Sequence, residues 1–123
     1  MKQEKASKRT SGFYIVLYHA VYEGLRSIGT SIPNAIIPYL QKDGAIGPGQ
    51  VVNNPETFDE SLRKIFGFGA NVIEKKILEV LYEKLQINRE VGDRFSFPQE
   101  VRNVQKKLPS LKVEALPLET VNV

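Results

Sequence analysis

The sequence predicts an all-α protein: a compact bundle of four to five helices followed by a C-terminal extension that is extended or partly helical. Two observations predict this class. Apolar residues recur every three or four positions through most of residues 13–88, which is the period of a helix with one buried side. Residue types that begin and end helices stand at the borders of these periodic segments.

The first periodic segment covers residues 13–28 and predicts a helix that ends at Gly29. Steps of 100° per residue place five apolar side chains on one arc: Phe13, Leu17, Val21, Leu25 and Ile28. Three tyrosines lie on the flank of this arc: Tyr14, Tyr18 and Tyr22. The opposite face carries His19, Glu23 and Arg26, which are neighbours across helical turns.

A second helix is predicted to begin at Ser31 or Ile32, because serine caps helices and Pro33 suits a first turn. Its expected buried side consists of Ala35, Ile36, Tyr39 and Leu40. Pro38 conflicts with a regular helix, since a proline in a helix interior costs roughly 3 kcal/mol or more. The second helix is therefore expected to be kinked or to begin later.

The third helix is predicted from Asn54 to Phe66 by two start signals: Asn54 followed by Pro55, and a capping box formed by Thr57 and Glu60. The fourth is expected from Ala70 to about Ile87. One i, i+4 row unites its main apolar residues: Ala70, Ile73, Ile77, Leu81 and Leu85. Leu78, Val80 and Tyr82 widen this row, so the fourth helix is predicted to be buried on more than one side, at the centre of the bundle.

The chain divides into three predicted parts. These are a basic flexible N-terminal tail (1–11), a helical core domain (12–88), and a C-terminal extension (89–123) that packs on the core or on a partner subunit. The extension is expected to contain a short helix from Pro98 to Leu108, built on Val101 and Val104. Beyond it, apolar and polar residues alternate, which indicates an edge strand or an extended arm.

The net charge of +3 is located in the N-terminal tail. Residues 1–10 hold four basic side chains against Glu4, so 13 of the 17 basic and 13 of the 14 acidic residues remain in the other 113 positions and cancel. The body therefore shows no excess of cations for nucleic-acid phosphates. No apolar stretch reaches the roughly 20 residues of a membrane span. The absence of cysteine excludes disulfides and thiolate metal sites, and we expect a cytoplasmic location with no membrane contact.

Gly67 and Gly69, in the stretch IFGFGANVIEKK, resemble the start of a phosphate-binding loop. A dinucleotide-binding loop needs a third glycine where Val72 stands, and it follows a strand. A Walker-type loop needs Lys followed by Ser or Thr, where Ala70 and Asn71 stand. The stretch is therefore interpreted as a joint between two helices, with Gly67 ending the third helix in a left-handed conformation.

The sequence contains no recognisable catalytic set. His19 is the only histidine, and it is expected at the surface, hydrogen-bonded to Glu23. Two carboxylate pairs, Asp59 with Glu60 and Glu79 with Glu83, have the spacing of a solvated helix face. We predict that the protein is not an enzyme and has no catalytic, cofactor-binding or metal-binding residues.

Two features are candidates for binding. The three tyrosines of the first helix fit the rim of a core or a subunit contact, and a base-stacking platform is the alternative. The basic residues of the N-terminal tail are the candidate contact for nucleic acid or an acidic partner, and a solvated tail is the alternative. These basic residues are Lys2, Lys5, Lys8 and Arg9.

Residues 13–88 resemble a family of small archaeal helical domains of unknown function, which occur alone and as output domains of archaeal signal-transduction proteins. The most specific part of the resemblance is the start of the third helix, the glycine joint and the helix after it. The matching residues are Pro55, Glu56, Phe58, Leu62, Ile65, Phe66, Gly67, Gly69, Ala70, Ile73, Glu74 and Lys75. Pro38 departs from the helix-forming residues usual in the family. The resemblance implies an all-helical output or interaction module and supplies no functional residues.

The functional expectation is a non-enzymatic interaction or regulatory module that forms a homodimer and binds a protein partner whose identity the sequence does not reveal. Excess apolar surface on short helices favours the homodimer. The alternative is a small nucleic-acid-associated regulator that uses the basic N-terminal arm. A third class, an enzyme, requires a deep polar pocket that gathers His19 or several carboxylates.

Overall fold

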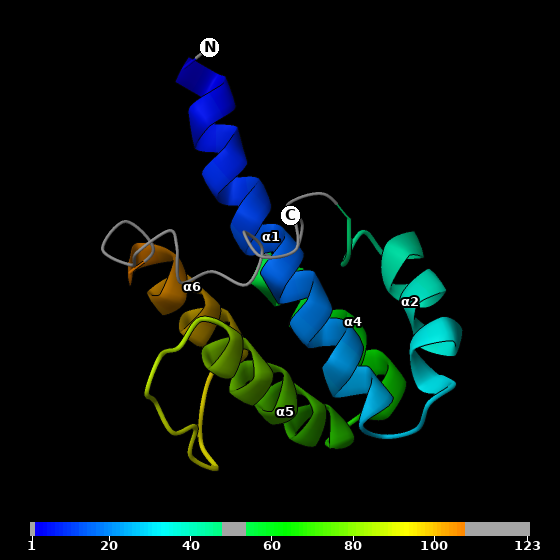
Figure 1. Ribbon diagram of the computed structural model, residues 1–123. Helices are drawn as coiled ribbons and strands as arrows, with labels where there is room; N and C mark the ends of the chain where they lie inside the picture. The colour runs from blue at the N-terminus through cyan, green and yellow to red at the C-terminus, as the bar shows by residue number, and fades with distance from the viewer. Residues whose placement is uncertain (1, 48–53, 108–123) are drawn as a thin grey trace.

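The computed structural model describes residues 2–47 and 54–107, with side chains described from residue 12 onward. Within these residues the chain forms five helices and no strand, which confirms the all-α prediction (Figure 1). In chain order the helices are α1 (Lys2–Arg26), α2 (Ile32–Lys42), α4 (Pro55–Phe66), α5 (Gly69–Lys84) and α6 (Phe97–Lys107).

Helix α5 lies at the centre of the bundle, as its broad apolar surface predicts. It packs against α1, α4 and α6. All members of its predicted row are buried: Ala70, Ile73, Ile77, Leu81 and Leu85. Full burial of one Leu or Ile side chain contributes about 1.5–3 kcal/mol, so this row is a main source of the stability of the bundle.

Helices α1 and α5 approach closely at Gly24. A Cβ atom built on Gly24 would lie 2.4 Å from Cγ1 of Ile77, so only glycine fits at this crossing. The predicted core arc of α1 is buried from Phe13 to Leu25. Ile28, the last predicted member, is 48% exposed, because α1 ends at Arg26 and the chain turns away from the core.

Helix α1 begins at Lys2, far before the predicted start at Phe13. The N-terminal part of α1 extends beyond the other helices (Figure 1). The physical reason is that residues 2–11 contain no proline or glycine and several good helix formers, so the helix propagates outward from its packed portion. The four basic residues of this segment therefore belong to a helix.

Helix α2 runs without interruption through Pro38, and Pro33 stands in its first turn as predicted. The ring of Pro38 faces solvent, which leaves the packing of the buried side intact. The predicted buried side is partly wrong. The buried residues are Pro33, Ile37 and Leu40, whereas Ala35 and Tyr39 are exposed and Ile36 is intermediate. The buried side of α2 therefore differs from the predicted one: it follows Pro33, Ile37 and Leu40, which are four and three residues apart.

The α4–α5 joint confirms that the glycine pair connects two helices and does not follow a strand. The Gly67 amide donates to the carbonyl of Arg63 at 2.8 Å, which ends α4, and α5 begins at Gly69. Gly67 has φ +58° and ψ −131°, so its φ is positive as predicted but its ψ is that of a turn and not of a left-handed helix. The predicted capping box is wrong: Thr57 lies inside α4, which begins at Pro55.

Helix α6 packs against α4 and α5 and completes the core. The ring of Phe97 lies 5.2 Å from that of Phe58 between centroids, and the predicted core residues Val101 and Val104 are buried. Leu108 and the alternating segment after it lie outside the described residues.

Candidate interaction surface

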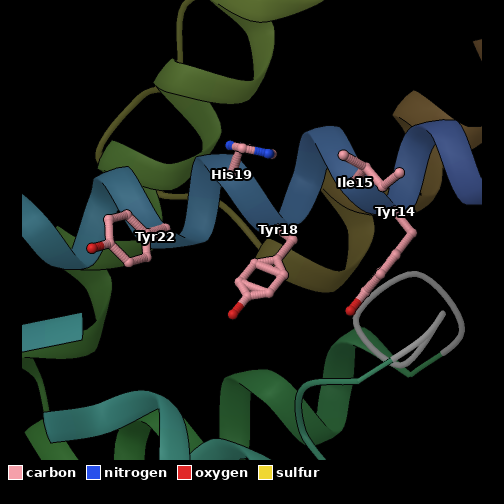
Figure 2. Close-up of a pocket in the computed structure, with 5 residues that line it drawn as sticks. All are labelled: Tyr14, Ile15, Tyr18, His19 and Tyr22. Carbon is pink, nitrogen blue, oxygen red and sulfur yellow. The ribbon is translucent and has the colours of Figure 1, made fainter. Parts of the chain in front are cut away.

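An apolar hollow of about 370 Å³ lies along one face of α1. Five residues line it, and we call them the aromatic groove: Tyr14, Ile15, Tyr18, His19 and Tyr22. Figure 2 shows the Tyr14 and Tyr18 rings extending from the same side of the helix, with Tyr22 one turn further along. A second hollow of about 420 Å³ continues from His19 and Tyr22 towards Ser27, the residue after α1.

The inner wall of the aromatic groove is held by the core. Tyr14 and Tyr18 are half-buried and pack against the core cluster, as predicted for residues on the rim of the core. Their rings meet edge to face at a centroid distance of 6.1 Å. Burial, and to a lesser extent the neighbouring Tyr18, raises the pKa of Tyr14. The outer wall is more open, because Ile15 and Tyr22 are each 37% exposed.

His19 lies at the exposed edge of the aromatic groove and makes no hydrogen bond with Glu23 within the described part of the chain, so that prediction is wrong. Glu23 pairs instead with Lys84, whose Nζ lies 2.8 Å from its carboxylate. The reason is tertiary: α5 brings an ammonium group to a carboxylate that the sequence places beside His19. This ion pair connects α1 to α5.

The basic residues of the N-terminal arm stand on the part of α1 that projects from the body (Figure 1). They are Lys2, Lys5, Lys8 and Arg9. These basic residues and the aromatic groove therefore belong to the same helix, with the basic residues nearer its N-terminus. The two carboxylate pairs of α4 and α5 do not line either hollow beside His19.

A second exposed apolar surface lies at the α4–α5 joint. Phe68 is 92% exposed and Val72 is 72% exposed, and Ile65 in the last turn of α4 is also exposed. The sequence singled out this stretch for its glycines, and the aromatic side chain between the glycines was not recognised as a surface feature.

Two buried glutamates were also missed by sequence reasoning. Glu74 is fully buried on α5, and no hydrogen-bond donor reaches either of its carboxylate oxygens among the described residues. Arg63 Nη2 lies 3.7 Å from Oε1, which is an ion-pair distance but too long for a hydrogen bond. Burial, followed by the influence of Asp59, raises the pKa of Glu74 to about 9. The available signal was its position four residues after Ala70 and four before Leu78, on the apolar side of the helix.

Glu100 on α6 is the second buried glutamate, and it is fully paired. Arg89 donates to both of its oxygens, from Nε at 2.9 Å and Nη2 at 2.8 Å, and the Tyr82 hydroxyl also donates to Oε1. The Arg89 guanidinium holds the pKa of Glu100 below its usual range. This network joins α5, the following loop and α6.

Two further findings concern the described residues as a whole. None of their helices is both long enough and apolar enough to cross a bilayer. No group of three or more His, Cys, Asp or Glu side chains among them is arranged to hold a metal ion.

The chain matches no family model, no curated protein and no solved structure. The resemblance to archaeal output domains therefore stays a hypothesis.

Proposed function

We propose that the protein is a non-enzymatic interaction module of the cytoplasm that pairs with a second copy of itself through the aromatic groove. The observation that carries this proposal is a row of tyrosines anchored in the core and still open at the surface. Aromatic side chains held in this way offer large, rigid contact areas, and they are enriched in protein interfaces.

The spacing of the tyrosines suits a second copy. Tyr14, Tyr18 and Tyr22 are four residues apart and symmetric about Tyr18. A two-fold axis at Tyr18 would place two α1 helices antiparallel, with Tyr14 of one copy facing Tyr22 of the other. A two-fold interface requires a patch that is complementary to itself, and this row meets that requirement.

The length of α1 provides room for the pairing. Its 25 residues span about 37 Å at 1.5 Å per residue, and its N-terminal part extends past the body. A stable interface buries about 800 Å² on each partner, more than five side chains supply. The second hollow, which runs from His19 to Ser27 beside the groove, would add to this area.

The test is sedimentation equilibrium of the full chain over a wide range of concentrations, with the variant Tyr22→Glu. Tyr22 is a partly exposed member of the groove, so a carboxylate there is compatible with folding but would be buried unpaired in a dimer. We expect a dimeric wild type and at least a tenfold weaker dimer for the variant, equivalent to about 1.4 kcal/mol.

The matched control is Tyr39→Glu. Tyr39 is 64% exposed on α2 and lies outside the groove, so this variant should dimerise like the wild type. A monomeric wild type, or equal weakening by both variants, would contradict pairing through the groove.

The resemblance to archaeal output domains adds the expectation of a regulatory role. In that role the paired module would transmit a signal to a protein partner through its remaining exposed surfaces.

A second candidate function is nucleic-acid binding by the N-terminal arm. One observation favours it: the basic residues stand on a projecting helix, which can lie along a phosphate backbone. The test is a salt titration of binding to random duplex DNA, comparing the wild type with a chain whose four arm cations are replaced by glutamine. Binding that is steeply salt-dependent and lost on replacement would support this function, and weak binding by both chains would exclude it.

A further inference from the structure

The α4–α5 joint contains a carboxyl group that lacks donors. Glu74 is fully buried, and an ionised carboxylate only accepts hydrogen bonds. Arg63 is the nearest cation, but it donates elsewhere: Nε to Asp59 at 3.0 Å and Nη2 to Asn71 at 2.6 Å. Arg63 is also 40% exposed, so solvent screens its charge. The ionised form of Glu74 is therefore poorly stabilised.

A proton on Glu74 supplies the missing donor. Asp59 and Glu74 lie beside the same guanidinium: Arg63 Nε is 3.0 Å from Asp59 Oδ1, and Arg63 Nη2 is 3.7 Å from Glu74 Oε1. Two neighbouring carboxylates do not both ionise readily when one of them is buried, and a protonated carboxyl group can donate to an ionised one. Arg63 Nε lies 3.0 Å from Oδ1 of Asp59, so Asp59 is placed as the acceptor of this hydrogen bond.

We propose that Asp59 and Glu74 form a proton-operated latch between α4 and α5, closed when Glu74 is protonated and loosened when it ionises. Asp59 belongs to α4 and Glu74 to α5, so a hydrogen bond between them would connect the two helices. The glycine between the two helices is open to its surroundings, since a Cβ atom added at Gly67 would meet nothing within 4 Å. Ionisation makes burial of the carboxylate costly, which favours its movement towards water.

The groups that act on Glu74 are few. Asp59 and Arg63, both on α4, are the charged side chains that influence it among the described residues, and α1, α2 and α6 contribute none. Burial is the main reason that its pKa rises to about 9. The latch is therefore closed at neutral pH and opens in mildly alkaline solution. Phe68 and Val72 stand on the same joint, so opening alters how this apolar surface is presented.

The first test is an NMR titration of the full-length wild type. The side-chain carboxyl ¹³C signal of Glu74 should titrate with a midpoint near 9. The backbone amides of Gly67 and Gly69 should shift with the same midpoint, because the joint responds to the same proton. A Glu74 midpoint between about 4 and 5, the range of an ordinary glutamate, would overturn the proposal, as would glycine amides that do not titrate.

The second test uses variants. Glu74→Gln should abolish the titration of the Gly67 and Gly69 amides. Glu79→Gln, which changes an exposed carboxylate on the same helix, should preserve it. A titration of these amides that persists in Glu74→Gln would overturn the proposal.

The third test keeps Glu74 and changes its partner. Asp59→Asn removes the carboxylate that raises the Glu74 pKa and offers an amide donor in its place. The Glu74 midpoint should fall by about one pH unit, a tenfold weaker affinity for the proton. An unchanged midpoint would show that Asp59 is not the second half of the latch.

Discussion

Glu74 and Glu100 are both buried glutamates on helices of the same core, and their pKa values move in opposite directions. The pKa of Glu100 is lowered, whereas that of Glu74 is raised to about 9. The difference lies in the donors. Glu100 receives two hydrogen bonds from Arg89 and one from Tyr82, and Glu74 receives none among the described residues. Burial alone therefore does not set the charge of a carboxyl group; the donors that the fold brings to it do.

The two sites have different consequences for the protein. Glu100 is ionised at neutral pH and links α6 to α5 through its hydrogen bonds, so we call it a structural tie. Glu74 sits near the α4–α5 joint and its pKa is raised to about 9, so it is suited to a change of state in mildly alkaline solution. The following substitutions separate these roles.

Replacing Glu100 should be the most damaging change. Glu100→Leu leaves the hydroxyl of the buried Tyr82 without its acceptor and removes both hydrogen bonds from Arg89. We expect the free energy of unfolding to fall by about 3 kcal/mol, measured by urea denaturation at pH 7. A loss below about 1 kcal/mol would mean that the network is not a tie.

The free energy of unfolding should also depend on the ionisation of Glu100 at acid pH. The pKa of Glu100 is lowered in the folded state, so its stabilisation is present above the unfolded pKa and is lost as pH falls through the folded pKa. Wild-type stability should therefore drop below about pH 4, and Glu100→Leu should flatten that drop. An equal drop in both proteins would assign it to other carboxylates.

Replacing Glu74 should raise the free energy of unfolding, whereas replacing Glu100 lowers it. Glu74→Leu removes a buried carboxyl group that receives no hydrogen bond among the described residues and whose one proposed hydrogen bond is to Asp59, and an apolar side chain costs less to bury, so we expect a gain of about 1–2 kcal/mol at pH 7. The gain should grow with pH: the raised pKa makes wild-type stability fall from the unfolded pKa up to about 9, and the leucine variant lacks this loss. Urea denaturation at three pH values measures it, and a destabilised variant would contradict the missing-donor account.

Removing one donor from Glu100 should have a smaller effect. Tyr82→Phe deletes the hydroxyl hydrogen bond and keeps the ring, and we expect a loss of about 1 kcal/mol in thermal or urea unfolding. Tyr39→Phe is the control, because Tyr39 is mostly exposed and should lose nothing measurable.

The smallest effect belongs to an exposed carboxylate. Glu23 pairs with Lys84 between α1 and α5, and both side chains are partly open to solvent. Glu23→Gln should change the free energy of unfolding by less than about 0.5 kcal/mol, and added salt should shrink the difference further. A larger effect would mean that solvent screens this pair less than its exposure indicates.

Much of the helical framework follows from sequence alone. The limits of α4 and α5 near Gly67, the buried row of α5 and the core arc of α1 were predicted, because helical period and helix-breaking residues act over a few neighbouring positions. The differences from prediction have two causes. Pro38 is accommodated inside α2, where packing of the opposite side outweighs a local rule, and α1 runs on to Lys2 because its good helix formers extend the helix through a segment with little to bury.

The candidate surfaces divide in the same way. The tyrosines of α1 were placed on the flank of a buried arc by their spacing, and the aromatic groove lies there. The charge states of Glu74 and Glu100 were beyond such reasoning, since Tyr82 and Glu100 lie 18 residues apart in the chain and meet only when α5 and α6 pack. The helical period can be read from residues close together in the chain, whereas a hydrogen bond between distant residues forms only when the helices pack.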